Sequence, residues 1–336
     1  MDTIILALFQ RKHKLKPTTT YHILVGRRST SILSYAFFND LLPVFGSFPE
    51  LKEEDYRRIL EQLMIQGKLE KIQSGELRYR AQLEVDQSEI LFFDQIDYFN
   101  YGKKEAQTWR LIQFLVQVAS YYGKSKAYLP LENSPYYLNR TRFFVKQHHS
   151  NLRQTIYEEL QMLLSELPND TANFIARSFN GYQTSGAVFF QLLPEEQQGQ
   201  PWTRLAISAR LHPFFKALEN QPTFLMAQFI APILQENKNQ SALQTKRLYK
   251  KGLTLEQIGQ QRQIKQSTLN DHLLEWALMD ETFPYSQFLT PTAYQLLANL
   301  PENSWEYAYK ELALSENISF FELRLYQIQM KRGKVC

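Results

Sequence analysis

The sequence predicts a mainly α-helical protein with a winged-helix-like N-terminal domain, a helical middle domain and a C-terminal helix-turn-helix followed by a small helical bundle. Three observations support this class. Apolar residues recur at helical spacing in most segments, a hairpin signal follows the third expected helix, and two short capped helices lie between 252 and 279. With 336 residues the chain is long enough for several domains. We expect domains at 1–85, 86–236 and 237–336.

The first domain is expected to contain three helices and a hairpin. The spacing of apolar residues predicts helices at 21–26, 31–42 and 52–66. Gly67 follows the third helix, where a left-handed residue is favoured. Two strand-like segments, 69–73 and 76–80, flank Ser74-Gly75 and predict a β-hairpin. Three helices followed by a hairpin is the winged-helix order.

The expected hairpin has an unusual charge pattern. If Gln73 pairs with Glu76, then Lys71 lies opposite Arg78 and shares one face of the wing with Arg78 and Arg80. Like charges opposite one another are unfavourable in water. They are less unfavourable beside phosphate, where bound counterions are released. The hairpin is therefore either a basic wing that contacts DNA or an exposed hairpin with tolerated charges.

The middle domain gives fewer signals. A buried helix is predicted at 107–122, and a long helical stretch from Pro135 to Leu167. Residues 189–193 fit either a strand or a helix end. Pro232 suggests a kink or a break in a later helix. The polar segment 237–241 is expected to be a linker.

Composition excludes several classes of protein. Hydrophobic residues make up 44% of the chain, which is enough for real cores. The one cysteine, Cys336, rules out a disulfide within the chain and a cysteine-based metal site. The apolar run Ile4–Phe9 is too short to span a bilayer, and it precedes a basic cluster instead of following one, unlike a signal peptide. We therefore expect a cytoplasmic protein without membrane contact.

Basic residues gather in two regions, although the net charge is only +4. Residues 11–28 contain six Lys and Arg and no acid, and residues 241–270 contain six against the single acid Glu256. Two such regions on a nearly neutral chain suggest two contact surfaces for a polyanion. Ordinary solvated helix faces are the alternative.

The segment 242–279 predicts a helix-turn-helix. A helix at 242–251 is ended by Gly252, and Thr254 with Gln257 fits a capping box at the start of the next helix. The turn is expected at 262–266, and Ser267 is expected to cap the second helix of the motif. The small core between these helices is expected to consist of Leu255, Ile258, Ile264, Leu269 and Leu273.

At these residues the chain resembles a known family. The stretch KKGLTLEQIGQQRQIKQSTLNDHLLEWAL resembles the helicase-associated helix-turn-helix found near the C-termini of some RecQ-type DNA helicases, and that of the YpbB-like proteins of Gram-positive bacteria. The tail TPTAYQLLANLPENSWEYAYKELALSENISFFELRLYQIQ has the same order of helices, with caps at Thr290-Pro291, Asn303 and Ser319. The stretch TTTYHILVGRRSTSIL resembles the N-terminus of YpbB-like proteins.

The resemblance implies an accessory role at DNA with a RecQ-type helicase as partner, in DNA repair or recombination. The sequence has no phosphate-binding loop of the G-x-x-x-x-G-K-[ST] type, so a helicase motor would belong to another chain. We expect the DNA-binding residues to be cations for phosphate and polar side chains for base edges. They are Lys246, Arg247, Lys250, Lys251, Arg262, Lys265, Gln266, Thr268 and Asn270 in the C-terminal domain, with Arg27, Arg28, Lys71, Arg78 and Arg80 in the N-terminal domain.

The second helix of the motif also includes acids. Asp271 and Glu275 are expected to face phosphate and so to oppose deep entry into a groove. We therefore expect weak, sequence-tolerant, salt-sensitive binding. Two alternatives remain open. One is a transcriptional regulator with a specific site, and the other is a scaffold whose helix-turn-helix docks protein through Trp276.

No motif in the sequence indicates catalysis. His148 and His149 are adjacent, so on a helix they point about 100° apart and cannot share a metal. No G-x-S-x-G or H-E-x-x-H pattern is present. We expect no enzyme activity, no cofactor, no metal site and no small-molecule substrate.

Overall fold

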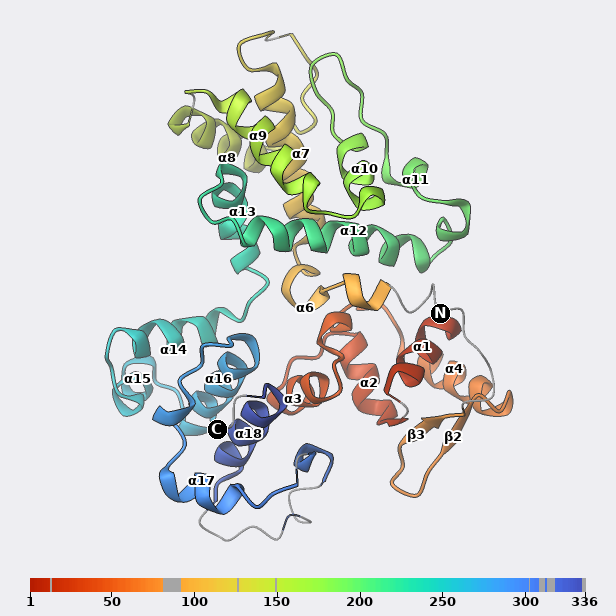
Figure 1. Ribbon diagram of the computed structural model, residues 1–336, viewed down its shortest axis with the longest axis vertical. Helices are drawn as coiled ribbons and strands as arrows, with labels where there is room; N and C mark the ends of the chain where they lie inside the picture. The colour runs from red at the N-terminus through yellow and green to blue at the C-terminus, as the bar shows by residue number, and fades with distance from the viewer. Residues whose placement is uncertain are drawn as a thin grey trace. The chain divides into compact units, whose positions relative to one another are not determined.

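The computed structural model describes residues 1–12, 14–80, 92–125, 127–148, 150–301, 303–307, 312 and 318–333. It is mainly helical, which confirms the predicted fold class (Figure 1). By its internal contacts the chain forms two units. Unit 1 consists of Met1–Lys16 and Pro43–Lys238, and unit 2 of Pro17–Leu42 and Asn239–Cys336. The units therefore do not follow the three consecutive segments expected from the sequence, and the expected boundary at 85 lies outside the described residues.

The first part of unit 1 combines two helices with a small sheet, and its helices differ from those expected. α1 (Asp2–Lys12) and α4 (Glu53–Ile65) pack with a three-stranded antiparallel sheet of order β1-β3-β2. The strands are β1 (Lys14–Leu15), β2 (Leu69–Lys71) and β3 (Leu77–Tyr79). The run Ile4–Phe9 is the buried part of α1, which the sequence analysis did not predict as a helix. The expected helices at 21–26 and 31–42 exist, but they belong to unit 2.

The hairpin of the wing is confirmed, but the expected register is wrong by one residue. Lys71 lies opposite Leu77, and Glu70 lies opposite Arg78. The reason is a three-residue turn. The N–H of Gly75, which has φ of +81°, donates to the carbonyl of Ile72, whose own N–H donates to the carbonyl of Glu76. A glycine in the left-handed region at this position is typical of three-residue hairpin loops.

The rest of unit 1 is a helical array with one hydrophobic core. Its long helices are α7 (Glu105–Tyr121), α9 (Leu152–Ser165), α12 (Trp202–Glu219) and α13 (Leu225–Gln235), and their apolar faces form the core. The shorter members are α6 (Tyr98–Tyr101), α8 (Pro135–Gln147), α10 (Asn169–Arg177), α11 (Phe189–Leu192) and the 3₁₀ turn η2 (Glu195–Gln197). Another 3₁₀ turn, η1 (Leu42–Val44), lies where the sequence passes from unit 2 to unit 1.

Two details of this array differ from the expectation. The long stretch from Pro135 to Leu167 is two helices, because Asn151 adopts a left-handed conformation with φ of 59° between α8 and α9. Pro232 lies inside α13, which continues through it. Among the helices that the structure describes, none combines the length and the apolar character needed to cross a bilayer.

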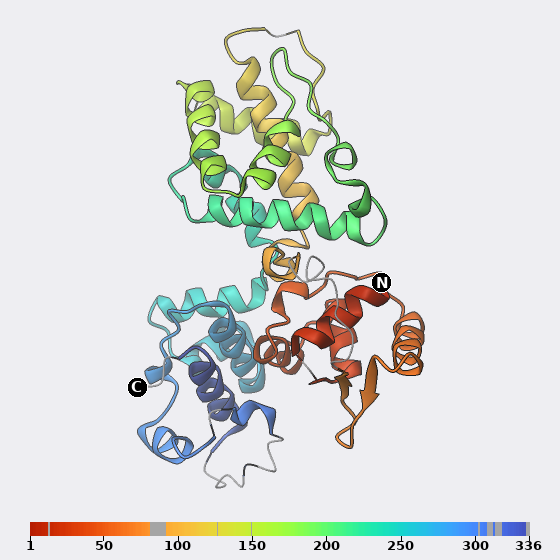
Figure 2. The ribbon, with the colours of Figure 1, turned by 45° about the vertical axis from the view of Figure 1, so that its right-hand side comes forward.

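Unit 2 joins two segments that are far apart in the sequence. α2 (Pro17–Leu24) and α3 (Thr30–Phe38) come from the N-terminal region, and α14 (Gln240–Lys250), α15 (Leu255–Arg262) and α16 (Gln266–Met279) from the C-terminal region. The unit is completed by η3 (Tyr285–Gln287), α17 (Pro291–Leu297), η4 (Ser304–Glu306) and α18 (Phe320–Lys331). α16 lies against α3, α14 and α18, and Figures 1 and 2 show these helices side by side.

Several helices of unit 2 begin at residues whose side chains cap them. The Ser29 hydroxyl accepts from the N–H of Ile32 at the start of α3, and Thr290 with Pro291 begins α17. Ser319 and Glu322 form a complete capping box at α18, as expected. The expected cap at Asn303 is different, since its side chain makes no capping bond and only the 3₁₀ turn η4 follows.

Candidate nucleic-acid interface

The helix-turn-helix of α15 and α16 follows from local sequence. The Thr254 hydroxyl accepts from the N–H of Gln257, and the Gln257 side chain accepts from the N–H of Thr254, so both halves of the predicted capping box are present. Ile258, Leu269 and Leu273 are fully buried between the helices, while the two other predicted core residues, Leu255 and Ile264, are half-buried. The motif is thus held by a small apolar core and by its own cap.

The turn between the two helices is sharp. Gln263 ends α15 in the left-handed region with φ of 52°, and the N–H of Ile264 donates back to the carbonyl of Gly259. α16 then begins at Gln266, with Lys265 as the preceding residue. The expected cap at Ser267 is wrong, because this residue already lies within the first turn of the helix. The exposed residues Lys265, Gln266 and Ser267 therefore surround an open helix N-terminus.

The second half of α16 is not a reading surface. Residues 272–278 are all buried, because α3, α14 and α18 surround this part of the helix. The expectation that Glu275 faces phosphate is wrong. Its carboxylate accepts from Nε of Arg28 at 3.1 Å and from Nδ2 of Asn239 at 2.8 Å. Asp271 is exposed, but it accepts a bond of 2.7 Å from the Thr30 hydroxyl.

Arg262 is part of a hydrogen-bond network inside unit 2. Its guanidinium donates to the carbonyl of Ser241 at 2.9 Å, to the Ser241 hydroxyl at 2.7 Å and to the Thr245 hydroxyl. The buried Thr245 hydroxyl in turn lies 2.8 Å from Nδ1 of His272. Burial, and then the charge of Arg262, lower the pKa of His272 below its ordinary value. A neutral imidazole can accept a hydrogen bond from the Thr245 hydroxyl, so this chain of hydrogen bonds joins α14, α15 and α16.

Lys246 also has an internal partner. Its ammonium lies 2.6 Å from Oδ2 of Asp280 and stacks over the Trp276 ring at 5.3 Å from the ring centroid. Nε1 of Trp276 donates to the same carboxylate oxygen at 3.0 Å. Burial alone would raise the pKa of Asp280, but the hydrogen bonds from Lys246, Thr282 and Trp276 outweigh it and hold this pKa well below its usual value. These contacts hold α14 against the C-terminal end of α16.

Four predicted cations of the motif remain exposed and have no acidic partner among the residues that the structure describes. Three of them are at the end of α14: Arg247 and Lys250 lie in its last turn, and Lys251 follows as its C-cap residue. Lys250 and Lys251 come three and four residues after Arg247, which places both on its side of the helix. The fourth, Lys265, precedes α16. We refer to Arg247, Lys250, Lys251 and Lys265 as the exposed cation set. Gln266 and Asn270 bond to each other at 2.8 Å on the outer face of α16, and Thr268 is half-buried.

The predicted cations of the N-terminal region fall into different surroundings. Arg27 bonds the His22 ring at 3.3 Å, and Arg28 pairs with Glu275. In the wing, Nε of Arg78 and Nε of Arg80 lie 2.7 Å and 2.8 Å from the Glu70 carboxylate. Bonds from these two arginines lower the pKa of Glu70.

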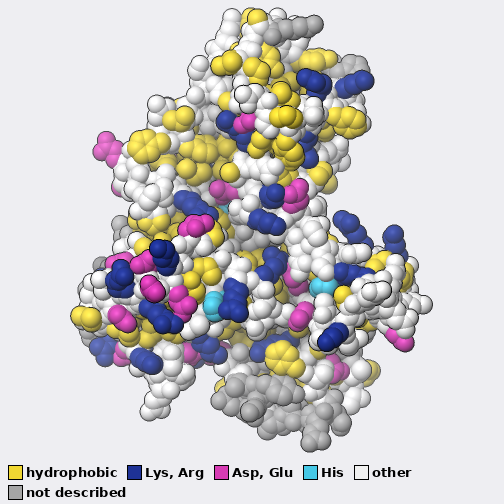
Figure 3. All heavy atoms as spheres, turned by 180° about the vertical axis from the view of Figure 1, so that it is seen from behind, with side chains coloured by type: hydrophobic (Ala, Val, Ile, Leu, Met, Phe, Trp, Pro, Cys, Tyr) yellow, Lys and Arg dark blue, Asp and Glu magenta, His cyan; other side chains and the backbone are white. Residues whose placement is uncertain are grey.

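The wing therefore has no continuous basic face of the kind expected. Its two arginines converge on Glu70, and the exposed Lys71 lies opposite Leu77 in the register of the sheet. The arginines of the neighbouring α4 are also paired with acids, Arg57 with Glu53 and Arg58 with Asp55. Figure 3 shows basic and acidic side chains intermingled at the left of the view, over α4.

The internal partners of three charged residues singled out from the sequence are residues that sequence reasoning missed. Thr30, Asn239 and Asp280 hold Asp271, Glu275 and Lys246. No local signal distinguishes them, because their partners lie 34 to 241 residues away in the sequence. Within the described residues, no three His, Cys, Asp or Glu side chains are grouped so that they could hold a metal ion.

The comparisons with known proteins agree with this geometry. Residues 241–327 match a family model described as a helix-turn-helix domain, and these residues lie in unit 2. The chain is 20% identical over 320 residues to "Protein YpbB" of Bacillus subtilis (strain 168), a match that covers 92% of this chain and 91% of that protein. No solved structure matches the chain. The chain is thus a homologue of Protein YpbB, similar to it over nearly the whole length, and contains a C-terminal helix-turn-helix domain.

Proposed function

We propose that this chain is a non-catalytic, DNA-binding accessory protein that acts with a RecQ-type DNA helicase in DNA repair or recombination. The observation on which the proposal depends is the exposed cation set beside the helix-turn-helix. Helix-turn-helix domains are common DNA-binding modules, and cations without acidic partners are the groups that bind phosphate. The RecQ-type partner rests on the resemblance of residues 250–278 to helicase-associated domains. Such a role requires a cytoplasmic location, beside the chromosome.

The proposed binding is sequence-tolerant. α16 exposes only its first turn and a half, so few side chains can reach base edges. Phosphate contacts from the exposed cation set position a protein on DNA but do not read sequence. This supports an accessory factor over a transcriptional regulator with one specific site.

The test of DNA binding is the salt dependence of affinity for a short duplex. Four phosphate contacts predict a slope of log K against log salt of about −3.6. The variant K250Q/K251Q should bring the slope to about −1.8. R177Q/K216Q is the matched control, because it removes two exposed cations of unit 1 that have no partner among the described residues. Equal slopes for the two variants would remove the basis of the proposal, and a protein-binding scaffold would then fit better.

The helicase partnership needs a separate experiment. The purified chain should retain a purified RecQ-type helicase at moderate salt and change its rate of duplex unwinding. An absence of both effects would contradict the partnership and leave the DNA-binding result intact. A footprint confined to one sharp sequence would instead favour the regulator.

A further inference from the structure

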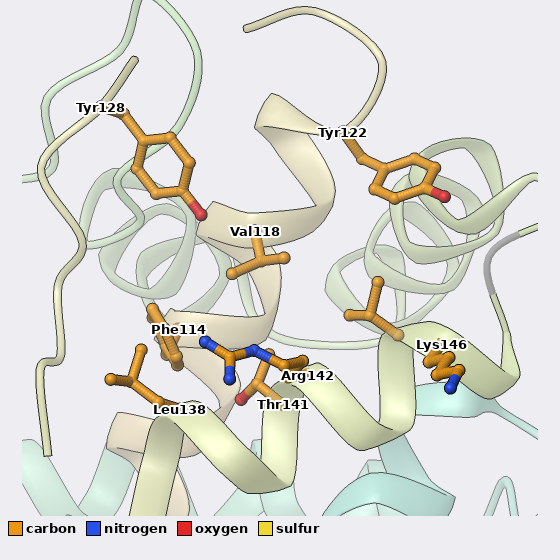
Figure 4. Close-up of a pocket in the computed structure, with 9 residues that line it drawn as sticks. Phe114, Val118, Tyr122, Tyr128, Leu138, Thr141, Arg142 and Lys146 are labelled. Atoms are coloured by element: carbon orange, nitrogen blue, oxygen red, sulfur yellow. The ribbon is translucent and has the colours of Figure 1, made fainter. Parts of the chain in front are cut away.

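A second surface of the molecule lies in the helical array of unit 1. Between α7 and α8 the structure contains a hollow of about 710 Å³. Its floor is apolar and includes Phe114, Val118 and Leu138, and two tyrosines, Tyr122 and Tyr128, border it (Figure 4). We refer to this hollow as the α7–α8 groove.

Hydrogen bonds and ring stacking within the chain hold the walls of the groove in place. The Gln117 side chain donates to the carbonyl of Leu129 at 3.2 Å and accepts from the N–H of Leu131 at 2.7 Å, which ties the extended segment 128–131 to α7. The rings of Tyr121 and Tyr128 stack with centroids 4.2 Å apart. A ligand would therefore meet a preformed cleft and would not have to order it.

Large apolar side chains remain exposed on the elements that form the groove. Tyr122, which lines it, is 41% exposed, and two residues next to lining residues in the sequence, Phe143 and Leu129, are 66% and 90% exposed. Exposed apolar surface of sufficient size marks interaction sites in soluble proteins. Figure 3 shows hydrophobic side chains in several patches over the upper part of the view, which contains α7 to α13.

Among the described residues that line the groove, the charged ones are basic. From Ala106 to Tyr157 the sequence contains seven Lys and Arg and a single acid, Glu132. That acid is already bound by Arg110. Arg142 and Lys146 line the groove itself, and Figure 4 shows the Arg142 guanidinium among the apolar side chains. The occupant should therefore combine apolar groups with negative charge.

We propose that the α7–α8 groove binds an acidic segment of a partner protein that inserts one or two bulky apolar side chains. The apolar floor fits such side chains, and Arg142 and Lys146 pair with the acids beside them. A single-stranded nucleic acid is less well matched. Stacked bases need a row of flat aromatic faces, whereas Val118, Leu138 and Val145 provide methyl groups. The inference does not depend on the DNA-binding function proposed above.

The test uses the full chain and a phage-displayed library of random twelve-residue peptides. We expect selection to enrich sequences that join Asp or Glu to Phe, Trp or Leu. The most enriched peptide is then synthesised with a fluorophore and titrated by anisotropy. R142E/K146E should weaken its binding at least tenfold, and so should replacement of the apolar residues of the peptide by Ser. R177E/K216E, with the same change of net charge, should bind as the wild type.

The groove can also be tested without a charge change. L138Q places a polar amide at the half-buried edge of the floor and should weaken the peptide, with circular dichroism to confirm an unchanged helix content. K250E/K251E should bind the peptide normally, which separates this surface from the helix-turn-helix. Two results would overturn the proposal. One is a set of selected peptides that bind R142E/K146E as well as the wild type. The other is a (dT)20 oligonucleotide that displaces the peptide and shares its sensitivity to R142E/K146E.

Discussion

Arg28 and Glu275 form an ion pair across 247 residues of sequence, with Nε of Arg28 3.1 Å from the Glu275 carboxylate. Arg28 lies between α2 and α3, and Glu275 lies in the buried half of α16. The pair therefore joins the N-terminal segment of unit 2 to the second helix of the helix-turn-helix. Arg28, which was expected to contact DNA, therefore holds two parts of unit 2 together.

Removal of Arg28 should weaken unit 2. R28A leaves the buried Glu275 carboxylate with Asn239 as its hydrogen-bond partner among the described side chains. We expect a cost of about 1–3 kcal/mol, below that of a fully buried pair because Arg28 is partly exposed. Hydrogen–deuterium exchange should become faster in both α3 and α16. The double variant R28A/E275A should cost less than the sum of the single variants. Simple additivity, or faster exchange in α3 alone, would contradict this coupling.

The Lys246–Asp280 pair should contribute to stability at neutral pH. The folded pKa of Asp280 is depressed, so its contribution is complete above the unfolded value of about 3.9 and is lost as pH falls below it. We expect D280N to lower the free energy of unfolding at pH 7 by about 1–2 kcal/mol. The difference from the wild type should shrink below about pH 4. Urea titrations at pH 7 and pH 3.5 measure it, and a constant difference would show that the charge of Asp280 is not responsible.

His272 should make unit 2 sensitive to mild acid. Burial depresses its folded pKa, so the unfolded chain takes up the proton more readily and stability falls as pH drops through about 6.5. H272Q should flatten this dependence, because glutamine does not titrate. H22Q is the control, since His22 lies on α2, where its ring contacts Arg27 and Tyr21 and is not part of the Arg262–Thr245–His272 network. Unfolding by urea at pH 7.5, 6.5 and 5.5 provides the comparison, and parallel slopes for H272Q and the wild type would exclude the role of His272.

The segment 17–42 should stabilise the C-terminal helices. Its buried residues include Ile32, Leu33 and Phe38, and the Phe38 ring stacks on Trp305 with centroids 5.6 Å apart. A chain that joins 17–42 to 239–336 through a flexible linker should melt above 239–336 alone by roughly 8–16 °C, which corresponds to about 2 kcal/mol. F38A in the linked chain should reduce this gain. Identical melting of the two chains would mean that α3 adds nothing to unit 2.

Local features of unit 2 could be predicted from the sequence. The capping boxes at Thr254 and Ser319 depend on residues three positions apart, so their pattern is visible without any knowledge of the fold. The buried positions Ile258, Leu269 and Leu273 follow from helical spacing. The fold class and the helix-turn-helix rest on signals of this kind.

Long-range contacts could not be predicted in the same way. Glu275 was expected to be exposed because carboxylates are rarely buried without a partner, and its partner Arg28 lies in another part of the sequence. The register of the wing depends on whether the loop has two or three residues, and Ser74-Gly75 fits both until the conformation of Gly75 is known. Of the fourteen cations and polar residues expected at DNA, these contacts leave the exposed cation set as the best candidates.

Unit 2 can assemble only late in translation, because its two segments are synthesised far apart in time. A ribosome adds about 5–20 residues per second, so the 247 residues between Arg28 and Glu275 take roughly 12–50 s to synthesise. During this interval α2 and α3 have emerged without the helices that cover Leu33 and Phe38. Unit 1 is complete first, and the helix-turn-helix acquires its N-terminal neighbour only when translation is nearly over. A prematurely terminated chain would therefore expose the apolar faces of α2 and α3 near its N-terminus. Chaperones or proteases can recognise exposed apolar surface of this kind.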